Sequence, residues 1–279
     1  DVFYFDSESA IDPEFLKNAG CNLDELMYIQ AMSVEFVLET IETLLASNNN
    51  RMLFIWDSLA LTPAISDIEG DFNPQSSMAV KARILAKGLS KLIIPIANSE
   101  STFLILNQLK ANITRSPSEA MTTPYMTPGG KATIYSYSLR IWLTGRKAKA
   151  SFVTDDKGFR VGSEVKVKLE KSRFGTQGRQ CNFKILWGDK IGIQDDESLF
   201  DAISSSESLK RLGAWYELHD TDGKALGSKF QSTKWTDRMK DDVFRQRVYE
   251  IMDEEIIFKF DKRLGNASDF YEEKQEVGN

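Results

Sequence analysis

Two stretches of the chain place carboxylate side chains directly behind a run of apolar residues. In the stretch Leu53 to Leu61, LFIWDSLAL, four apolar residues precede Asp57 and Ser58, and the apolar run Val2 to Phe5 precedes Asp6, Ser7 and Glu8. Such runs predict strands that are buried on both faces of a parallel sheet, and ligands bind at the carboxyl edge of such sheets. An aspartate at that edge can position Mg²⁺ beside nucleotide phosphates. Taken alone, an apolar run that ends in aspartate is more often a strand followed by a turn.

The elements around these stretches alternate between strand and helix patterns. Asp12 and Pro13 form a helix start signal, and Gly20 ends that helix. A short strand is predicted for Leu26 to Ile29 and a helix for Ser33 to Ala46. Phe103 to Leu106 is a further predicted strand, followed by the polar residues Asn107, Gln108 and Lys110. This alternation indicates a doubly wound α/β fold.

Two long polar segments separate these elements. Ala64 to Ser77 is predicted to be a mobile loop, and Ala111 to Lys131 is a second loop with almost no periodicity. Loops of about twenty residues inside a compact domain tend to be functional. Between them, Met78 to Ile93 predicts an amphipathic helix with four cations outside its apolar face, namely Lys81, Arg83, Lys87 and Lys91.

The second half of the chain predicts several strands and then a smaller unit. Strand patterns cover Ile134–Leu143, Ser151–Arg160, Val161–Leu169 and Cys181–Trp187, and a basic connection contains Lys171, Arg173 and Arg179. Gly188 to Gly192 marks a boundary, beyond which we expect a small α+β unit that contains Leu199–Leu212, Trp215–Leu218 and a helix over Asp241–Phe258. The expected domains are residues 1–190, residues 191–262 and an acidic, disordered tail over 263–279.

Composition excludes several classes of protein. The 279 residues are 42% hydrophobic, with no apolar run near the roughly 18 residues of a membrane span. Cys21 and Cys181 form neither a disulfide framework nor a metal-binding spacing, and His219 is the single histidine, which argues against histidine-based zinc or triad chemistry. The formal net charge of −6 does not by itself suggest a nucleic-acid partner, although charge acts locally.

Two motif-like stretches are decoys. Gly129-Gly130-Lys131 resembles the end of a phosphate-binding P-loop, but Tyr125 stands where the first glycine is required and Ala132 replaces the hydroxyl residue. The motif GxxxxGK[ST] occurs nowhere in the 279 residues. The stretch that begins at Asp220 lacks the downstream glutamate of a calcium loop, so a hairpin turn is the better interpretation.

Seven segments, in order from about Phe3 to Glu255, resemble those of the RecA family of recombinases, and two of them are also similar to its phage UvsX branch. They are FDSESAIDP, FIWDSLALTP, IEGDF with the Met78 helix, LILNQLK, the Thr127–Ala132 region, VGSEVKVKLEKSR and LGAWY. The resemblance implies a RecA-like P-loop NTPase core with a mostly parallel central sheet and a small α+β C-terminal domain. It also implies an ATP-dependent recombinase that exchanges DNA strands in recombination and repair.

The same resemblance assigns roles at a nucleotide site that binds ATP and Mg²⁺. Glu8 would be the general base that orients the attacking water, and Asp57, with Ser58 beside it, would hold Mg²⁺ through water. Gln108 would sense the γ-phosphate and pass its presence to the adjoining loop.

Further roles concern adenine and the neighbouring subunit. Asp12 and Phe15 would contact adenine by a hydrogen bond and by stacking. Lys171 and Arg173 would reach the nucleotide of the neighbouring copy in a helical filament or ring, as an arginine finger does.

The resemblance also implies single-stranded and double-stranded DNA as partners, and a cytoplasmic location in a bacterial or phage-infected cell, with no membrane partner. The residues that would lie along the DNA are Arg83, Lys91, Lys110, Gly129 and Gly130. They would give sequence-tolerant contacts to the phosphate backbone.

Two departures from the family pattern set further expectations. The chain opens at Asp1 directly into a strand, so we expect it to be a fragment that lacks a preceding strand, P-loop and helix. Such a fragment is expected to bind ATP poorly, to be inactive alone and to assemble poorly. The alternatives are a non-catalytic DNA-binding or regulatory module and another RecA-fold motor such as a hexameric helicase. The Trp215 unit and the basic Lys171–Arg173 connection favour the recombinase over the helicase.

Overall fold

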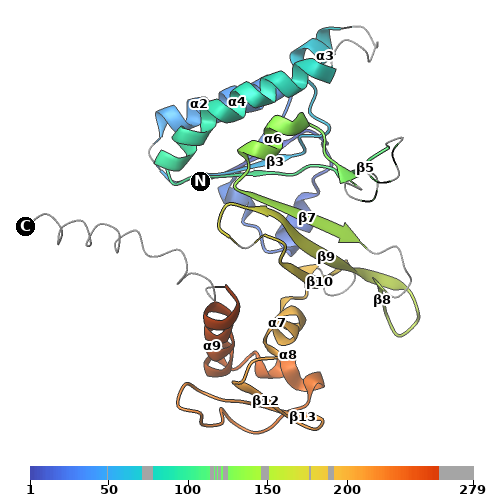
Figure 1. Ribbon diagram of the computed structural model, residues 1–279, viewed down its shortest axis with the longest axis vertical. Coiled ribbons are helices and arrows are strands. Elements are labelled where there is room, and N and C mark those ends of the chain that lie inside the picture. Colours follow the sequence, from blue (N-terminus) through green and yellow to red (C-terminus); the bar gives the residue numbers. More distant parts are fainter. Residues whose placement is uncertain are drawn as a thin grey trace, which may run out of the picture. The chain divides into compact units, whose positions relative to one another are not determined.

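A computed structural model describes residues 1–48, 50–70, 78–113, 116, 118, 121, 125–145, 151–175, 177–187 and 192–257. The chain divides into two compact units, of which the first is Asp1–Arg140 with Lys171–Gln177 and the second is Ile141–Glu170 with Gly178–Asn279 (Figure 1). The predicted boundary near Gly188–Gly192 stays a prediction. In the part of the chain that the structure describes, every helix is too short or too polar to span a bilayer.

The first unit is built on a four-stranded sheet whose paired strands are all parallel, which confirms the α/β prediction. The strands are β1 (Val2–Asp6), β2 (Leu26–Gln30), β3 (Leu53–Asp57) and β4 (Thr102–Ile105), in the order β2-β1-β3-β4. Apolar runs of four or five residues suffice for these strands because parallel strands draw most of their stability from side-chain burial.

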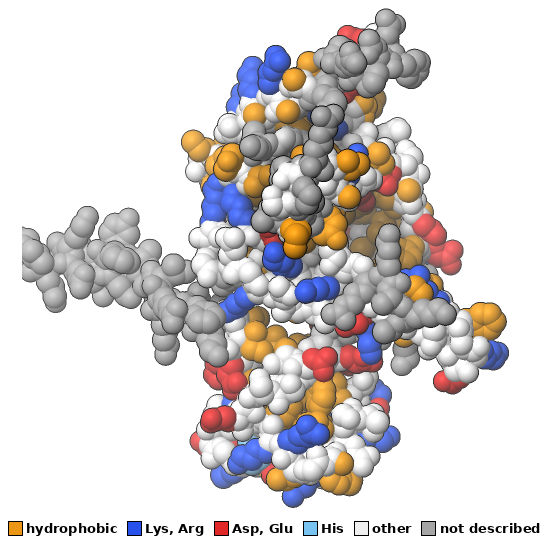
Figure 2. Space-filling model, turned by 45° about the vertical axis from the view of Figure 1, so that its right-hand side comes forward, with side chains coloured by type: hydrophobic (Ala, Val, Ile, Leu, Met, Phe, Trp, Pro, Cys, Tyr) orange, Lys and Arg blue, Asp and Glu red, His pale blue; other side chains and the backbone are white. Residues whose placement is uncertain are grey.

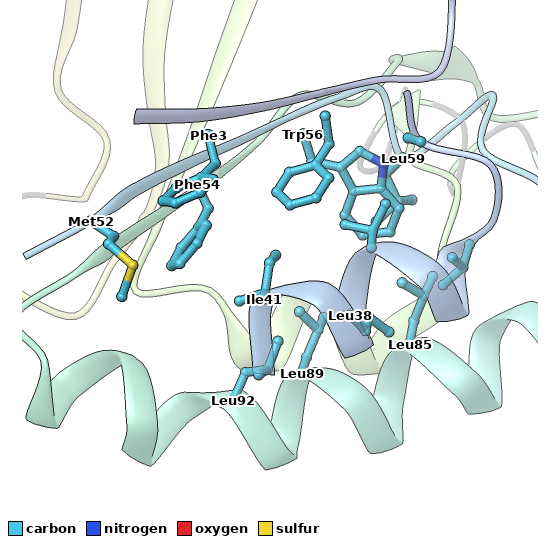
Figure 3. Close-up of a cluster of buried hydrophobic side chains, with 14 residues drawn as sticks. Phe3, Leu38, Ile41, Met52, Phe54, Trp56, Leu59, Leu85, Leu89 and Leu92 are labelled. Atoms are coloured by element: carbon cyan, nitrogen blue, oxygen red, sulfur yellow. The ribbon is translucent and has the colours of Figure 1, made fainter. Parts of the chain in front are cut away.

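Two helices, α2 (Val34–Ser47) and α4 (Met78–Asn98), pack against one face of this sheet. The Ser33 hydroxyl caps α2 by accepting a hydrogen bond from Phe36 N at 3.1 Å. Figure 3 shows side chains of β1 and β3 pointing toward those of the two helices, among them Phe54, Trp56, Ile41 and Leu89. This layer is the core of the unit.

The prediction of strands buried on both faces was wrong in part. Phe54 and Trp56 of β3 are completely buried toward the helices, whereas Leu53, Ile55 and Asp57 on the opposite face are only half-buried. Strand β1 alternates in the same way before it ends at buried Asp6. An apolar run cannot show how completely its second face is covered, because both patterns are equally hydrophobic.

The two predicted loops contain regular structure. Helix α3 (Ile65–Glu69) lies inside the first, and residues 71–77 lie outside the described part. The start of α3 is fixed because Ala64 N donates to Asp67 Oδ2 at 3.0 Å and Ile65 N donates to Glu35 Oε2 at 3.1 Å. In the second, β5 (Lys110–Ala111) pairs antiparallel with β6 (Tyr125–Met126), and most of the residues between them lie outside the described part.

A helix replaces the beginning of the strand predicted over Ile134–Leu143. Helix α6 spans Gly130–Ser136, and strand β7 (Leu139–Gly145) starts only after it. Ile134 and Tyr135 favour strands intrinsically. The left-handed backbone at Gly129, with φ of 104°, instead starts a helix that packs on α4, so tertiary packing overrides local propensity. The remaining small elements of the first unit are α1 (Pro13–Asn18) and η1 (Leu23–Glu25).

The second unit holds the longer strands of the chain and its C-terminal helices. One sheet runs β11-β10-β9-β7, with β8 also paired to β9, and its strands beyond β7 are β8 (Phe152–Thr154), β9 (Arg160–Ser172), β10 (Gln180–Leu186) and β11 (Gly192–Ile193). A turn at Asp155–Gly158 joins β8 to β9, with Gly158 N donating to Asp155 O at 3.0 Å.

The rest of this unit is the expected α+β arrangement. It contains α7 (Asp195–Ile203), the antiparallel pair β12 (Leu209–Leu212) and β13 (Trp215–Leu218), η3 (Ser232–Lys234), α8 (Trp235–Arg238), α9 (Asp242–Ile251) and a π-helical turn, η4 (Met252–Ile257). Its core combines aliphatic side chains with an aromatic cluster, in which Phe230, Trp235 and Phe244 are in mutual contact. Figure 2 shows both signs of charge on the visible face of its described part. The predicted acidic tail lies outside the described residues.

Candidate functional site

Polar side chains gather where β1 and β3 end. Because these strands are parallel neighbours, their carboxyl ends share one edge of the sheet, where ligands bind in open α/β sheets. Asp6 and Asp57 are direct partners in the strand register. We call Asp6, Ser7, Glu8, Asp57 and Ser58 the strand-end site.

Two serines bind the two strand ends to each other. Ser7 N donates to Asp57 O at 2.7 Å, and Ser58 N donates to Ser7 Oγ at 2.9 Å. The Ser7 hydroxyl in turn donates to the carbonyl oxygens of Asp57, at 3.1 Å, and Ser58, at 3.0 Å. The Asp57–Ser58 peptide bond is cis. The hydrogen bonds of Ser7 and Ser58 hold the backbone at the two carboxylates in one arrangement.

Glu8 is held at both its backbone and its side chain. Ser58 Oγ donates to Glu8 Oε1 at 2.9 Å. Asp6, only 2% exposed, accepts at Oδ1 from Glu8 N at 2.8 Å and from Ser9 N at 3.0 Å. A carboxylate that accepts two consecutive backbone N–H groups fixes a tight turn, so Asp6 places Glu8 beside the end of β3.

Two tyrosine hydroxyls donate to the strand-end carboxylates. Tyr4 OH lies 2.6 Å from Asp57 Oδ2, and Tyr28 OH lies 2.8 Å from Asp6 Oδ2. Burial and the hydrogen bond to Asp57 raise the pKa of Tyr4. The hydrogen bond to Asp6, followed by burial, raises the pKa of Tyr28. Both hydroxyls therefore remain protonated donors at neutral pH.

The arrangement leaves two carboxylate oxygens available. Among the described residues, Asp57 Oδ1 and Glu8 Oε2 have no hydrogen-bond partner. Carboxylate and hydroxyl oxygens are the donors that Mg²⁺ prefers. Nowhere in the described ranges do three or more acidic, histidine or cysteine side chains form a metal cage. An available carboxylate oxygen suits Mg²⁺, which is usually held by one or two carboxylates together with waters and phosphate oxygens.

Lys81 of α4 is bound to the turn that follows the strand-end site. Its ammonium nitrogen lies 2.6 Å from Thr62 O, 2.9 Å from Leu59 O and 3.3 Å from Ala60 O. Burial is the main cause that lowers the pKa of Lys81, and nearby Lys110 lowers it further, while Asp67 raises it. Lys81 was predicted only to lie outside the apolar face of this helix; its side chain reaches these three carbonyls, a contact that the pattern does not show.

Gln108 lies beyond the end of β4, at the same edge of the sheet. Leu106 N donates to Trp56 O at 2.9 Å and Leu59 N donates to Leu106 O at 3.0 Å, which joins the ends of β3 and β4. Asn107 then accepts from Gln108 N at 2.9 Å and donates to Pro128 O at 2.9 Å. Gln108 itself is exposed. The Asn107 side chain thus connects the backbone at Gln108 to Pro128, which precedes Gly129.

Asp12 and Phe15 belong to the first helix after the site. Asp12 is the N-cap of α1 and accepts at Oδ1 from Glu14 N at 2.9 Å and from Phe15 N at 3.4 Å. The Phe15 ring is 46% exposed. The capping bonds leave Oδ2 of Asp12 and the Phe15 ring accessible, and the adenine contact stays a prediction.

Lys171 and Arg173 cap helix α6 in this structure. Lys171 Nζ lies 2.7 Å from Ile134 O and 3.1 Å from Tyr135 O, and Arg173 donates to Tyr135 O at 2.7 Å. Cations are favourable at a helix C-terminus, where carbonyls lack intrahelical partners. Burial, followed by repulsion from Arg173 and Arg140, lowers the pKa of Lys171. Their predicted role at a neighbouring copy stays a prediction.

The predicted DNA-contacting residues fall into different surroundings. Arg83 and Lys110 are exposed, and Lys91 forms an ion pair with Glu42 at 2.7 Å. Such an exposed pair contributes at most about 1 kcal/mol. Gly129 and Gly130, by contrast, are packed closely. A side-chain carbon at Gly129 would lie 3.2 Å from Leu59 and 3.3 Å from Leu85, and one at Gly130 would lie 3.3 Å from Ala82.

Four side chains of the site were not identified by their sequence pattern. Tyr4 and Tyr28 lie within apolar strand patterns, Asn107 was noted only as a polar residue, and Lys81 was grouped with surface cations. For the tyrosines a signal exists, because each stands two register positions before an aspartate on the next strand. It becomes visible only when the strand order is known.

Comparison with known proteins gives a consistent result. Residues 1–192 match the family model described as the RecA N-terminal domain. The chain is 31% identical to "Protein RecA" of Leptospira biflexa over 224 residues, which is 80% of this chain and 54% of that protein. It is 30% identical to "Protein RecA" of Halalkalibacterium halodurans over 217 residues, which is 78% of this chain and 58% of that protein. The chain thus spans just over half the length of these curated relatives.

One solved structure is also similar, the crystal structure of the RadB recombinase. It matches with a TM-score of 0.44 and 19% sequence identity over 69% of this chain and 77% of that chain. This structural similarity is too low to add to the sequence matches.

Proposed function

Since the chain belongs to the RecA family, we propose that it carries the ATP-hydrolysing edge and the DNA-binding surface of a DNA strand-exchange recombinase. The complete natural protein would form filaments on single-stranded DNA and act in homologous recombination and repair. Its cofactor would be Mg²⁺, its substrate ATP, and its partners single-stranded and double-stranded DNA and further copies of itself.

The observation that carries this proposal is the connection of Glu8 to Asp57 through Ser58. Ser58 directly follows Asp57 and donates to Glu8 Oε1 at 2.9 Å, while Tyr4 donates to Asp57 Oδ2. One oxygen of each carboxylate is thereby held, and the other is left available at the carboxyl edge of the sheet. Phosphoryl transfer to water needs this combination of a residue that orients water and a residue that positions Mg²⁺.

In this mechanism the chain's residues mainly orient the attacking water and hold Mg²⁺ and the γ-phosphate. Glu8 accepts a proton from the attacking water at Oε2 and keeps that water aligned, because Ser58 prevents rotation of the carboxylate. Asp57 would hold Mg²⁺ through water, and the bound ion would neutralise phosphate charge. Gln108 contacts the γ-phosphate, and the Asn107 bond to Pro128 connects that contact to the Gly129 turn.

DNA binding is proposed for the surface around the start of α4 and the Gly129 turn. Arg83 and Lys110 provide exposed positive charge there, while Gly129 and Gly130 adopt positive φ and form the turn that packs against α4. Lys81 ties this helix to the turn that follows Asp57. DNA contacts and the nucleotide site are therefore joined through a short series of hydrogen bonds.

Assembly with further copies is proposed to complete the nucleotide site. Lys171 and Arg173 would exchange the α6 carbonyls that they bind here for the phosphates of a neighbouring copy's nucleotide. A phosphate oxygen is a stronger partner for a cation than a backbone carbonyl, because it carries a negative charge whereas the carbonyl offers only a dipole.

A non-catalytic DNA-binding or regulatory module is the second candidate. Such a module would share the fold and the DNA surface but would not turn over ATP.

ATP hydrolysis by the complete natural protein separates these two functions. A recombinase is expected to hydrolyse Mg²⁺-ATP and to do so faster with single-stranded DNA. Binding of DNA with no hydrolysis, with and without DNA, would instead support the regulatory module.

A further inference from the structure

Two tyrosines lie on the face of the parallel sheet opposite α2 and α4, and each donates a hydrogen bond to one strand-end carboxylate. We propose that Tyr4 and Tyr28 are positioning residues with separate tasks: Tyr4 fixes Asp57 for Mg²⁺, and Tyr28 acts through Asp6 to fix Glu8 for proton transfer. This inference rests on the proposed function, because it assigns tasks within the same strand-end site.

The two pairs repeat one geometry on neighbouring strands. Tyr4 is in register with Ile55 of β3 and donates to Asp57, two positions further along that strand. Tyr28 is in register with Tyr4 of β1 and donates to Asp6, again two positions further. Diagonal neighbours on one face of a sheet are within reach of a long aromatic side chain. The hydroxyl reaches the carboxylate in both cases because the spacing is the same.

Tyr4 determines which oxygen of Asp57 is available. Its hydroxyl lies 2.6 Å from Oδ2, whereas Oδ1 has no partner among the described residues. Asp57 is half-buried and belongs to the last position of β3. Without the hydroxyl, its carboxylate could rotate about its terminal torsion, which is broad for aspartate. Groups that orient a metal-binding carboxylate typically affect metal affinity or activity by tenfold to a hundredfold.

Tyr28 acts one step away from Glu8. The buried Asp6 carboxylate uses Oδ2 for Tyr28 and Oδ1 for the backbone N–H groups of Glu8 and Ser9. Loss of the Tyr28 hydroxyl would leave an oxygen of buried Asp6 unpaired and allow it to turn away from the Glu8 N–H. The turn that presents Glu8 would loosen, while Asp57 would keep its own tyrosine.

The two tasks predict different kinetic changes in the complete natural protein. Tyr4→Phe is expected to raise the Mg²⁺ concentration for half-maximal ATP hydrolysis about tenfold, with little change in the rate at saturating Mg²⁺. Tyr28→Phe is expected to lower the saturated rate roughly tenfold or more, with the Mg²⁺ dependence unchanged, because misplacement of a catalytic group costs rate rather than metal affinity. Both substitutions keep the ring, so packing is conserved.

Tyr249→Phe is the matched control, since it makes the same change on α9 in the other unit, and it is expected to alter neither quantity. Thermal unfolding of each variant reports whether the fold is retained. If both site variants behave as the wild type, or if both change the same kinetic quantity, the assignment of separate tasks is wrong. If the wild-type protein itself shows no Mg²⁺-dependent hydrolysis, the proposed function fails rather than this inference alone.

Discussion

Ser58 Oγ donates a hydrogen bond to Glu8 Oε1 at 2.9 Å, which joins the turn after β1 to the end of β3. The two residues are fifty positions apart in the chain but meet because β1 and β3 are parallel neighbours. The bond holds the carboxylate proposed as general base beside the aspartate proposed to position Mg²⁺.

Arg83→Ala and Lys110→Ala are expected to weaken binding of single-stranded DNA by similar factors for any base sequence, because phosphate contacts carry no sequence information. Each substitution that removes one phosphate contact should reduce the slope of log affinity against log salt by about 1. Fluorescence anisotropy over a salt series with labelled oligonucleotides measures both quantities.

Arg51→Ala is the control for these variants. Arg51 precedes β3, at the amino edge of the sheet opposite the site, and forms an exposed ion pair with Glu100. The Arg51→Ala substitution also removes one positive charge, and it should leave the slope of log affinity against log salt unchanged. An equal loss of affinity in the control would mean that overall charge, rather than the surface at α4, determines DNA binding.

Lys171→Ala and Arg173→Ala are expected to impair the nucleotide site of a neighbouring copy. In a mixing titration, wild-type ATP hydrolysis should fall more steeply than the wild-type fraction, because a mutant subunit also disables its wild-type neighbour. The α6 capping role predicts in addition a stability loss of about 0.3–1 kcal/mol, measured by urea unfolding. Strictly additive activity with only the stability loss would assign both residues to capping alone.

Alkaline pH should reveal the hydrogen bond between Tyr4 and Asp57. The pKa of Tyr4 is raised in the folded protein by burial and by Asp57, so the folded state retains the hydroxyl proton where the unfolded state has lost it. The stabilising contribution is therefore fully present below about pH 10, the ordinary tyrosine pKa, and is lost as pH rises above it.

Tyr4→Phe should accordingly make the free energy of unfolding fall less steeply above about pH 10 than in the wild type. Urea unfolding at a series of alkaline pH values tests this, with Tyr249→Phe as the control. Parallel pH profiles for the wild type and Tyr4→Phe would show that Tyr4 does not retain its proton through Asp57.

The parallel sheet and the helices beside it could be predicted, because uninterrupted apolar runs indicate the strands and apolar residues at helical spacing indicate the helices. The strand ends followed from the same patterns, so Asp6, Glu8 and Asp57 could be placed at one edge. The start of α6 could not be predicted, because Ile134 and Tyr135 favour a strand locally. Packing on α4 and the left-handed backbone at Gly129 instead require a helix.

The hydrogen-bond partners within the site were also beyond the sequence. A tyrosine in an apolar strand and a lysine on an amphipathic helix have ordinary roles in most proteins. Tyr4 reaches Asp57, and Lys81 reaches three carbonyls, only because the strand order and the α4 position bring them there. Such contacts depend on tertiary structure, which a one-dimensional pattern does not encode.

The most direct test of the proposed catalytic site is Glu8→Gln in the complete natural protein, assayed for ATP binding and for hydrolysis with single-stranded DNA. The amide keeps the shape and can still accept from Ser58, but it cannot take a proton, so hydrolysis should be abolished while the ATP dissociation constant stays within about twofold of wild type. Glu39→Gln on α2, away from the strand ends, should change neither quantity. Hydrolysis at the wild-type rate in Glu8→Gln, or a parallel loss of binding and hydrolysis, would contradict the role of Glu8 as general base.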